Sequence, residues 1–188
     1  MTDKADVFLD GMFLQMVLDS FGLEGKVDYE KFTNKLAKVE NSERQRTYYF
    51  DALPYVAPSL DMASSSANQK NKQKFLDKLS YLDSFQVELG YVKLEEKTCP
   101  SCKNAVKIPR QKKVDILLAT RLIERSLEVD KIVLVAGDAD FTPAIEVAKK
   151  KAKIVLAFAP SSTSTQLKQK SDRKIELSKA FFNDCLRA

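Results

Sequence analysis

Residues 131–143 read KIVLVAGDADFTP and combine a strand, a turn and two acids in one short run. The apolar segment 132–136, ended by Gly137, predicts a strand buried on both faces of a parallel sheet. Asp138 and Asp140 follow it directly. Because open α/β sheets bind ligands at the carboxyl ends of their strands, these two acids are candidates for a functional site.

Strand and helix patterns alternate on both sides of this run. Thr142 and Pro143, for example, fit the N-cap and first turn of a helix over 144–151. The alternation predicts an α/β fold, a Rossmann-like three-layer sandwich with a mostly parallel central sheet. We expect strands over 5–9, 46–50, 85–94 (with a turn or bulge at Gly90), 132–136, 154–158 and around 175. We expect helices over 12–21, 28–39, 69–82, 113–127, 144–151, a short one up to 170, and 178–186.

The length of the chain suits one domain covering residues 1–188. Segment 95–111 is the least regular part, and we read it as an insertion that contains two cysteines. A loop is predicted from Pro54 through the serines at 64–66, and Asp51 before it is read as a turn residue.

Composition narrows the chemistry that the chain can perform. Its 44% hydrophobic and 30% charged residues are typical of a globular protein, and no apolar run approaches the length of a membrane helix. With no signal-peptide pattern at its start, the chain is expected to be cytoplasmic and to have no membrane partner. It contains no His, which excludes His bases, His triads and His metal ligands. Catalysis would therefore use carboxylates, Cys, Lys, hydroxyl groups or a metal.

Charge is distributed unevenly along the chain. Residues 1–100 hold 13 basic and 16 acidic side chains, whereas residues 101–188 hold 18 and 10. A basic half favours a polyanionic partner such as RNA, although ordinary surface lysines also explain the excess. The candidates for contacts with RNA phosphates are Arg44, Arg46, Arg110, Lys112 and Lys113.

Four acids are spaced so that they could meet at one edge of the sheet. Asp10 ends the first strand, Asp115 begins the helix after the basic segment, and Asp138 and Asp140 follow the central strand. The first and central strands are commonly neighbours where a doubly wound sheet reverses its order, so we expect these acids to converge. Converging carboxylates repel one another unless a cation lies between them, and oxygen ligands suit Mg²⁺ or Mn²⁺. Each acid also has a structural explanation as a cap or turn residue.

Several longer motifs accompany these acids. They are VFLDG at 7–11, YYFDALP at 48–54, KKVDILLATRLI at 112–123, LVAGDADFTPAIEVAKKKAKIVLAF at 134–158 and STQLKQKSDRKIEL at 164–177. In these motifs the chain resembles NYN-domain proteins, the LabA-like group of PIN-like nucleases. The resemblance implies a PIN-type fold and a metal-dependent endoribonuclease that hydrolyses RNA phosphodiester bonds. By position, it implies catalytic and metal-binding roles, with Mg²⁺ or Mn²⁺, for Asp10, Asp115, Asp138 and Asp140.

One position departs from the pattern of the family. NYN proteins usually show Asp-Gly-x-Asn after the first strand, and this chain has Phe13 where the Asn stands. The loss of a polar side chain from the site predicts reduced catalytic efficiency or loss of activity. A second hypothesis therefore stays open, in which the chain is a catalytically weak or inactive NYN-fold module that binds RNA or a protein partner.

The cysteines offer a separate hypothesis. Cys99 and Cys102 have the spacing of one zinc knuckle, but a structural Zn²⁺ site needs further ligands. The remaining Cys185 is far along the chain, so the matching pair of a second chain would complete four ligands in a homodimer. The alternative is a reduced pair in a surface β-turn, and the sequence leaves both readings open.

Overall fold

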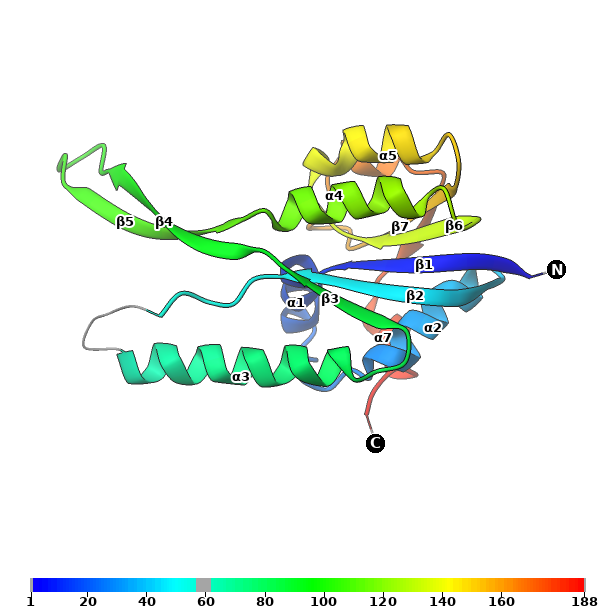
Figure 1. Ribbon diagram of the computed structural model, residues 1–188, viewed down its shortest axis with the longest axis horizontal. Helices are drawn as coiled ribbons and strands as arrows, with labels where there is room; N and C mark the ends of the chain where they lie inside the picture. Colours follow the sequence, from blue (N-terminus) through cyan, green and yellow to red (C-terminus); the bar gives the residue numbers. More distant parts are fainter. Residues whose placement is uncertain (1, 57–61, 188) are drawn as a thin grey trace.

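The computed structural model describes residues 2–56 and 62–187 and has a six-stranded parallel sheet at its centre (Figure 1). The strand order is β3-β2-β1-β6-β7-β8, and every neighbouring pair is parallel. The strands are β1 (Asp3–Asp10), β2 (Ser42–Asp51), β3 (Phe85–Leu89), β6 (Lys131–Val135), β7 (Lys153–Phe158) and β8 (Arg173–Glu176).

Helices cover both faces of this sheet and make it the middle of three layers, as the sequence predicts (Figure 1). One face carries α1 (Gly11–Ser20), α2 (Tyr29–Val39), α3 (Met62–Ser80) and α7 (Lys179–Asn183). The other carries α4 (Val114–Arg125), η1 (Ala139–Phe141), α5 (Thr142–Ala148) and α6 (Thr165–Lys170). None of the described helices is both long enough and apolar enough to cross a membrane.

The hydrophobic core is divided by the sheet into two clusters. Along β1, Val7 and Leu9 belong to the cluster under α1 and α2, whereas Phe8 belongs to the cluster under α4. The Phe8 ring lies 4.9 Å from the ring of Tyr48 and 5.7 Å from that of Phe50. Successive side chains of a strand point to opposite faces, so a strand covered on both sides is apolar at most of its positions. This requirement explains the continuous apolar runs in the sequence.

The order of the sheet reverses between β1 and β6. From β1 the chain adds β2 and β3 on one side, and it then crosses over to add β6, β7 and β8 on the other. The predicted neighbourhood of the first and central strands is confirmed, because β1 and β6 pair from Ala5↔Lys131 to Leu9↔Val135. Ligand sites of open α/β sheets lie at such a reversal, beyond the carboxyl ends of the strands.

Two local predictions were wrong. Ser64–Ser66 were expected in a loop, but they lie inside α3, whose second half is anchored by the buried Leu76 and Leu79. Serine is only moderately unfavourable in a helix, so anchoring elsewhere overrides the local pattern. Thr142 is not an N-cap, since Phe141 occupies that position and the buried Thr142 hydroxyl has no hydrogen-bond partner in the described structure.

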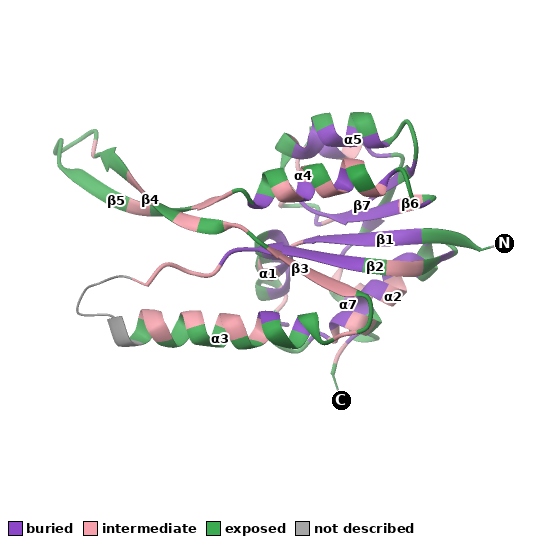
Figure 2. Cartoon of the chain, viewed as in Figure 1, coloured by how far each residue is buried: buried purple, intermediate pink, exposed green. Residues whose placement is uncertain are grey.

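The strand predicted over 85–94, with a turn or bulge at Gly90, is in fact two separate strands on either side of that glycine. β3 ends at Leu89, and β4 (Tyr91–Thr98) then leaves the sheet and pairs antiparallel with β5 (Ala105–Lys112). This hairpin contains the segment 95–111 that we read as an insertion, and it projects from the body of the molecule (Figure 1). Its residues are exposed or half-buried along its whole length (Figure 2).

Candidate functional site

The four predicted acids come together at the edge where the carboxyl ends of the strands lie, which we call the carboxyl edge. Asp10 is the last residue of β1, and Asp138 follows the neighbouring β6 by three residues. Asp115 lies in the first turn of α4, which the hairpin leads into at this edge. The acids act on one another electrostatically, because Asp115 raises the pKa of Asp10 while Asp138 and Asp140 raise that of Asp115.

Asp10 is held in place as the N-cap of α1. One of its oxygens, Oδ1, accepts hydrogen bonds from the backbone N–H groups of Met12 and Phe13, each at 3.1 Å. The next residue must be glycine, because a Cβ at Gly11 would lie 2.6 Å from Oδ2 of Asp51 and 2.8 Å from a backbone oxygen. The Asp-Gly pair therefore both starts the helix and brings the first two strands together at this edge.

Asp138 is held in a similar way after β6. Its Oδ1 accepts a hydrogen bond of 2.9 Å from the backbone N–H of Asp140 and caps η1. A Cβ at Gly137 would lie 2.5 Å from the carbonyl oxygen of Ser162 and 2.6 Å from the ring of Phe13, so a larger residue would not fit. Oδ1 of Asp10 and Oδ1 of Asp138 thus have the structural role of helix caps. The other oxygen, Oδ2, of each has no hydrogen bond or ion pair with any described residue.

Burial and the repulsion between acids make Asp10 and Asp115 harder to ionise than an exposed aspartate. Burial raises the pKa of Asp10 to about 6, the N–H groups of Phe13 and Met12 oppose this shift, and the charge of Asp115 adds to it. Burial also raises the pKa of Asp115, with further contributions from Asp138 and Asp140. Within the described parts of the chain, no Lys or Arg forms an ion pair with any of the four. A cation bound among them would relieve the repulsion.

A cleft of about 450 Å³ opens beside the start of α1 and is lined by Asp10 and Asp138. Ser162 and Ser164, from the segment after β7, line it as well. Phe13 also lines the cleft, and it is only 6% exposed because its ring packs against Gly137. At the position of the family's polar residue, the cleft therefore has an apolar wall.

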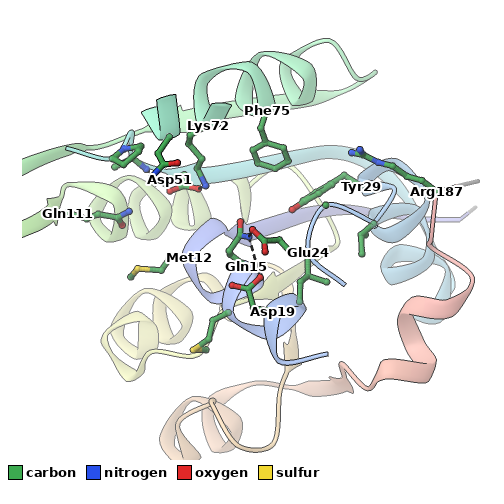
Figure 3. A pocket seen from close by; sticks show the side chains of 17 residues that line it. Met12, Gln15, Asp19, Glu24, Tyr29, Asp51, Lys72, Phe75, Gln111 and Arg187 are labelled. Carbon is green, nitrogen blue, oxygen red and sulfur yellow. Dashed lines mark hydrogen bonds and ion pairs between the residues drawn. The ribbon is translucent and has the colours of Figure 1, made fainter. Parts of the chain in front are cut away.

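A second cavity, of about 710 Å³, lies between α1 and α3 and adjoins the first (Figure 3). Met12 and Met16 line both cavities, and both are exposed. Tyr29 and Phe75 supply apolar surface, and the amide of Gln15 points into the same space (Figure 3). Cavities of this size accommodate groups as large as a nucleotide.

Asp51 is the residue that the sequence reading undervalued. It is not a turn residue but the buried end of β2, 3% exposed, with Nζ of Lys72 at 2.5 Å from Oδ2. Its charge raises the pKa of Asp10, so it belongs electrostatically to the carboxyl edge. The signal that could have identified it is its place at the end of a strand beside β1, as for Asp10 itself. The sequence could not identify Lys72 as the ion-pair partner of Asp51, because this pair joins two separate elements, β2 and α3.

Two of the predicted RNA contacts lie away from the acids. Arg44 donates hydrogen bonds to Asn34 Oδ1 (2.7 Å) and Thr47 Oγ1 (3.2 Å). Arg46 is in register with Asp6, four residues before Asp10, which corresponds to about 13 Å along a strand. The structure therefore does not bring Arg44 and Arg46 to the carboxyl edge.

The other predicted contacts lie on the segment that runs into Asp115. Arg110 is exposed on β5, and Lys112 forms an ion pair of 2.5 Å with Glu95. Lys113 adopts a left-handed backbone conformation (φ 69°) just before α4, with its Nζ 5.5 Å from the centre of the Tyr91 ring. These three cations approach the acids from the base of the hairpin.

Comparison with known proteins agrees with this arrangement. Residues 4–178 match the NYN domain family, which covers nearly the whole chain. The chain belongs to the NYN domain family. The predicted membership is confirmed, and with it a PIN-like three-layer α/β fold of the nuclease superfamily.

Solved structures support the fold of this NYN protein. A protein of unknown function from Vibrio parahaemolyticus, VPA0982, is 18% identical with a TM-score of 0.60, and the match covers 99% of this chain and 97% of that one. Phosphoglycerate kinase from Coxiella burnetii (11% identity, TM-score 0.39, 97% and 50% covered) and a Sir2 enzyme (11%, 0.37, 96% and 88%) are too distant to support any argument. No curated protein matches the sequence.

NYN and PIN-like nucleases typically use divalent metal ions, so the donors of this site can be tested against such an ion. In the described parts of the chain, no three Asp, Glu or Cys side chains lie close enough together to hold an ion by themselves. Mg²⁺, however, is commonly held by one or two carboxylates, with waters and substrate phosphates as its other ligands. Oδ2 of Asp10 and of Asp138 is unengaged, and all the donors are oxygens, so the residues fit Mg²⁺ or Mn²⁺.

Proposed function

We propose that this NYN protein is a cytoplasmic, metal-dependent endoribonuclease that hydrolyses RNA phosphodiester bonds at Asp10, Asp115, Asp138 and Asp140. The observation that carries the proposal is the meeting of these acids at the reversal of the sheet with no basic partner among the described residues. Asp115 raises the pKa of Asp10, and Asp138 and Asp140 raise the pKa of Asp115, so their repulsion costs the folded protein stability unless a cation lies among them. Their retention is best explained by a ligand that needs them.

The chain's own residues would share the work as follows. Asp10 and Asp138 would hold Mg²⁺ or Mn²⁺ through Oδ2, and Asp115 and Asp140 would complete the negative surface. The ion, when bound, neutralises charge on a phosphate and makes a water molecule more acidic. Asp10, with its pKa of about 6 before the ion binds, is mostly ionised at neutral pH, and Oδ2 would then be ready to bind the ion. The N–H groups of Met12 and Phe13 fix its orientation.

RNA would approach along the base of the hairpin. Arg110, Lys112 and Lys113 could contact phosphates on the way to Asp115, and such contacts orient a nucleic acid without reading its sequence. Lys112 would have to leave Glu95 to do so, which is an exchange of one exposed ion pair for another.

The second candidate is a weak or inactive NYN-fold module that binds RNA or a protein partner. Phe13 favours it, because the ring replaces a polar group of the family's site and packs against Gly137 beside Asp138. Under this hypothesis the cleft would still bind RNA through the basic segment, and the acids would not support cleavage.

Cleavage of a panel of single-stranded and structured RNAs separates the two candidates. The wild-type protein is assayed with Mg²⁺, with Mn²⁺ and with EDTA, beside Asp138→Asn. The matched control is Asp130→Asn, because Asp130 precedes the same strand β6 and lies at its opposite end. The nuclease proposal predicts metal-dependent cleavage that Asp138→Asn abolishes and Asp130→Asn preserves. Binding without cleavage under every condition would favour the inactive module.

A further inference from the structure

The β4–β5 hairpin is regular but has no hydrophobic core of its own. Its eight residue pairs run from Tyr91↔Lys112 to Thr98↔Ala105, yet none of residues 91–112 is buried. An isolated two-stranded hairpin is at best marginally stable in water. The projecting arm therefore calls for a stabilising element beyond its backbone hydrogen bonds, and its tip carries the groups that could provide one.

The tip is a tight turn around Cys99 and Cys102. The backbone N–H of Cys99 donates to the carbonyl of Asn104 (2.8 Å), and the N–H of Lys103 donates to the carbonyl of Cys99 (2.9 Å). Lys103 adopts a left-handed conformation (φ 60°), which is uncommon for a residue with a side chain. The turn therefore holds Cys99 and Cys102 at the end of the hairpin, three residues apart, in the spacing of a zinc knuckle.

Each chain can supply only these two cysteines to a site at the tip. The chain has no His, and the third cysteine, Cys185, is 1% exposed in the core under α7, with its Sγ 3.9 Å from the carbonyl of Phe181. In the part of the chain that the structure describes, no third Asp, Glu or Cys joins the pair. Cys99 is half-buried and Cys102 is exposed, and both are free thiols, so the pair is accessible to a second molecule.

We infer that Cys99 and Cys102 of two copies of this chain hold one Zn²⁺ in a tetrahedral four-cysteine site that joins the tips of two hairpins. Structural zinc sites are closed by four such ligands. The thiols bind as thiolates and release their protons to solvent, while zinc stays divalent. The hairpin projects from the body, so two tips can meet while the bodies stay apart (Figure 1).

The charge of the arm agrees with this arrangement. Residues 91–112 hold six basic and two acidic side chains, so two bare arms would repel each other. A zinc ion with four thiolates carries a net negative charge, which attracts the basic residues around it. Lys97, Lys103 and Lys107 lie on or next to the turn and would surround such a centre.

The test measures zinc and mass on the full chain, purified in reducing buffer without chelator. Elemental analysis should find about half a zinc ion per chain, as a shared four-ligand site requires, and light scattering should give the mass of a dimer. A strong chelator should remove the zinc and halve the mass. Cobalt substituted for zinc should show the absorption of tetrahedral thiolate coordination.

Variants identify the ligands. Cys99→Ser and Cys102→Ser should each lose zinc and the dimer but keep the helical circular dichroism signal of the wild type, since the arm contains no helix and the body does not depend on the tip. Cys185→Ala should keep both zinc and dimer. Asp138→Asn should also keep both, which separates this site from the proposed nuclease centre. One zinc per monomer, zinc retained by Cys99→Ser, or a zinc-free protein with a Cys99–Cys102 disulfide would each overturn the inference.

Discussion

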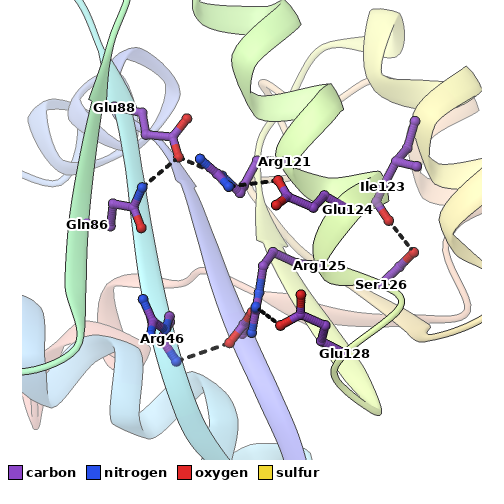
Figure 4. A network of polar contacts seen from close by, with 10 residues as sticks. Arg46, Gln86, Glu88, Arg121, Ile123, Glu124, Arg125, Ser126 and Glu128 are labelled. Atoms are coloured by element: carbon purple, nitrogen blue, oxygen red, sulfur yellow. Dashed lines mark hydrogen bonds and ion pairs between the residues drawn. The ribbon is translucent and has the colours of Figure 1, made fainter.

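Asp6 and Asp10 lie on the same strand, four residues apart, and burial raises the pKa of both. Their surroundings differ completely. Asp6 is fully buried, and its two oxygens accept hydrogen bonds from Nε of Arg125 (2.7 Å) and from the backbone N–H of Arg46 (3.1 Å). Arg125 also pairs with Glu128, and one turn away Arg121 bridges Glu88 and Glu124 (Figure 4).

Among the residues that the structure describes, Asp10 has no such cation. The hydrogen bonds that it accepts come from the start of α1, and the neighbouring charges that raise its pKa, Asp115 and Asp51, are acids. A single helix creates both environments. Asp115 and Arg125 are ten residues apart on α4, about 15 Å, while Asp6 and Asp10 are about 13 Å apart on β1. The end of α4 thus gives Asp6 a partner, and its start gives Asp10 a like charge.

This difference separates a structural carboxylate from one available for a ligand. The direction of the pKa shift is the same for both and therefore does not distinguish them. What differs is whether the protein itself supplies the opposite charge. At Asp6 it does, so a further cation would have no role. At Asp10 it does not, which is the state expected of a residue whose partner arrives from solution.

The most drastic way to remove the difference is to give Asp10 the kind of partner that Asp6 has. Asp115→Arg would place a fixed cation at the carboxyl edge, lower the pKa of Asp10 and exclude a divalent ion. We expect the rate of RNA cleavage to fall at least about 1000-fold, which corresponds to a rise of several kcal/mol in the activation barrier. The melting temperature should be equal to or above that of the wild type. Thr120→Arg is the control for a new arginine on this helix, since Thr120 is exposed on the same helix. Cleavage by Asp115→Arg within tenfold of the control would contradict the proposed role of this edge.

The converse change takes the partner from Asp6. Arg125→Met leaves a buried carboxylate unpaired, and the free energy of unfolding should fall by roughly 3 kcal/mol, measured by urea denaturation. Cleavage per folded molecule should not change. Adding Asp6→Asn to Arg125→Met should restore part of the loss, because the unpaired charge is then gone. No loss of stability in the single variant would show that Asp6 and Arg125 do not act as a structural pair.

Removal of the charge at Asp10 should raise the free energy of unfolding, whereas Arg125→Met should lower it. The pKa of Asp10, about 6, lies above the unfolded value of 3.8, so the folded state holds a proton that the unfolded state releases. Stability from this group is complete below the unfolded pKa and is lost as pH rises through the folded pKa. Asp10→Asn should therefore be more stable than the wild type by about 2 kcal/mol above pH 7, allowing for solvent screening, and lose this advantage near pH 4. Denaturation is measured at several pH values. A difference in free energy of unfolding between the two proteins that does not change with pH would rule out the raised pKa.

The smallest effect is expected from a single RNA contact at the base of the hairpin. Arg110→Ala should weaken RNA binding roughly 3- to 10-fold at low salt and reduce the slope of log affinity against log salt by about one. Lys150→Ala is the control, because Lys150 is exposed at the far end of α5 and should have no effect. Equal losses in the two variants would mean that binding follows net charge rather than this surface.

Much of this architecture is predictable from the sequence. The continuous apolar runs at 132–136 and 154–158 predict buried strands of a parallel sheet. Because ligand sites of such sheets lie at the carboxyl ends of the strands, Asp10 and Asp138 are then predicted to lie close together. What could not be predicted depends on contacts between distant segments. Asp51 differs from a turn residue only because α3 brings Lys72 to it. In the same way, the sequence indicates a turn or bulge at Gly90, but not that β4 leaves the sheet there, because this depends on its pairing with β5.

The central claim is that the unpaired acids of the carboxyl edge bind a divalent cation, and direct titration with Mn²⁺ tests it without requiring turnover. Calorimetry, or the electron paramagnetic resonance signal of free Mn²⁺, would compare the wild type with Asp138→Asn and with Asp130→Asn, the acids at the two ends of β6. The account predicts binding by the wild type and Asp130→Asn, and at least tenfold weaker binding by Asp138→Asn. Equal binding by all three proteins, or binding by none, would contradict it.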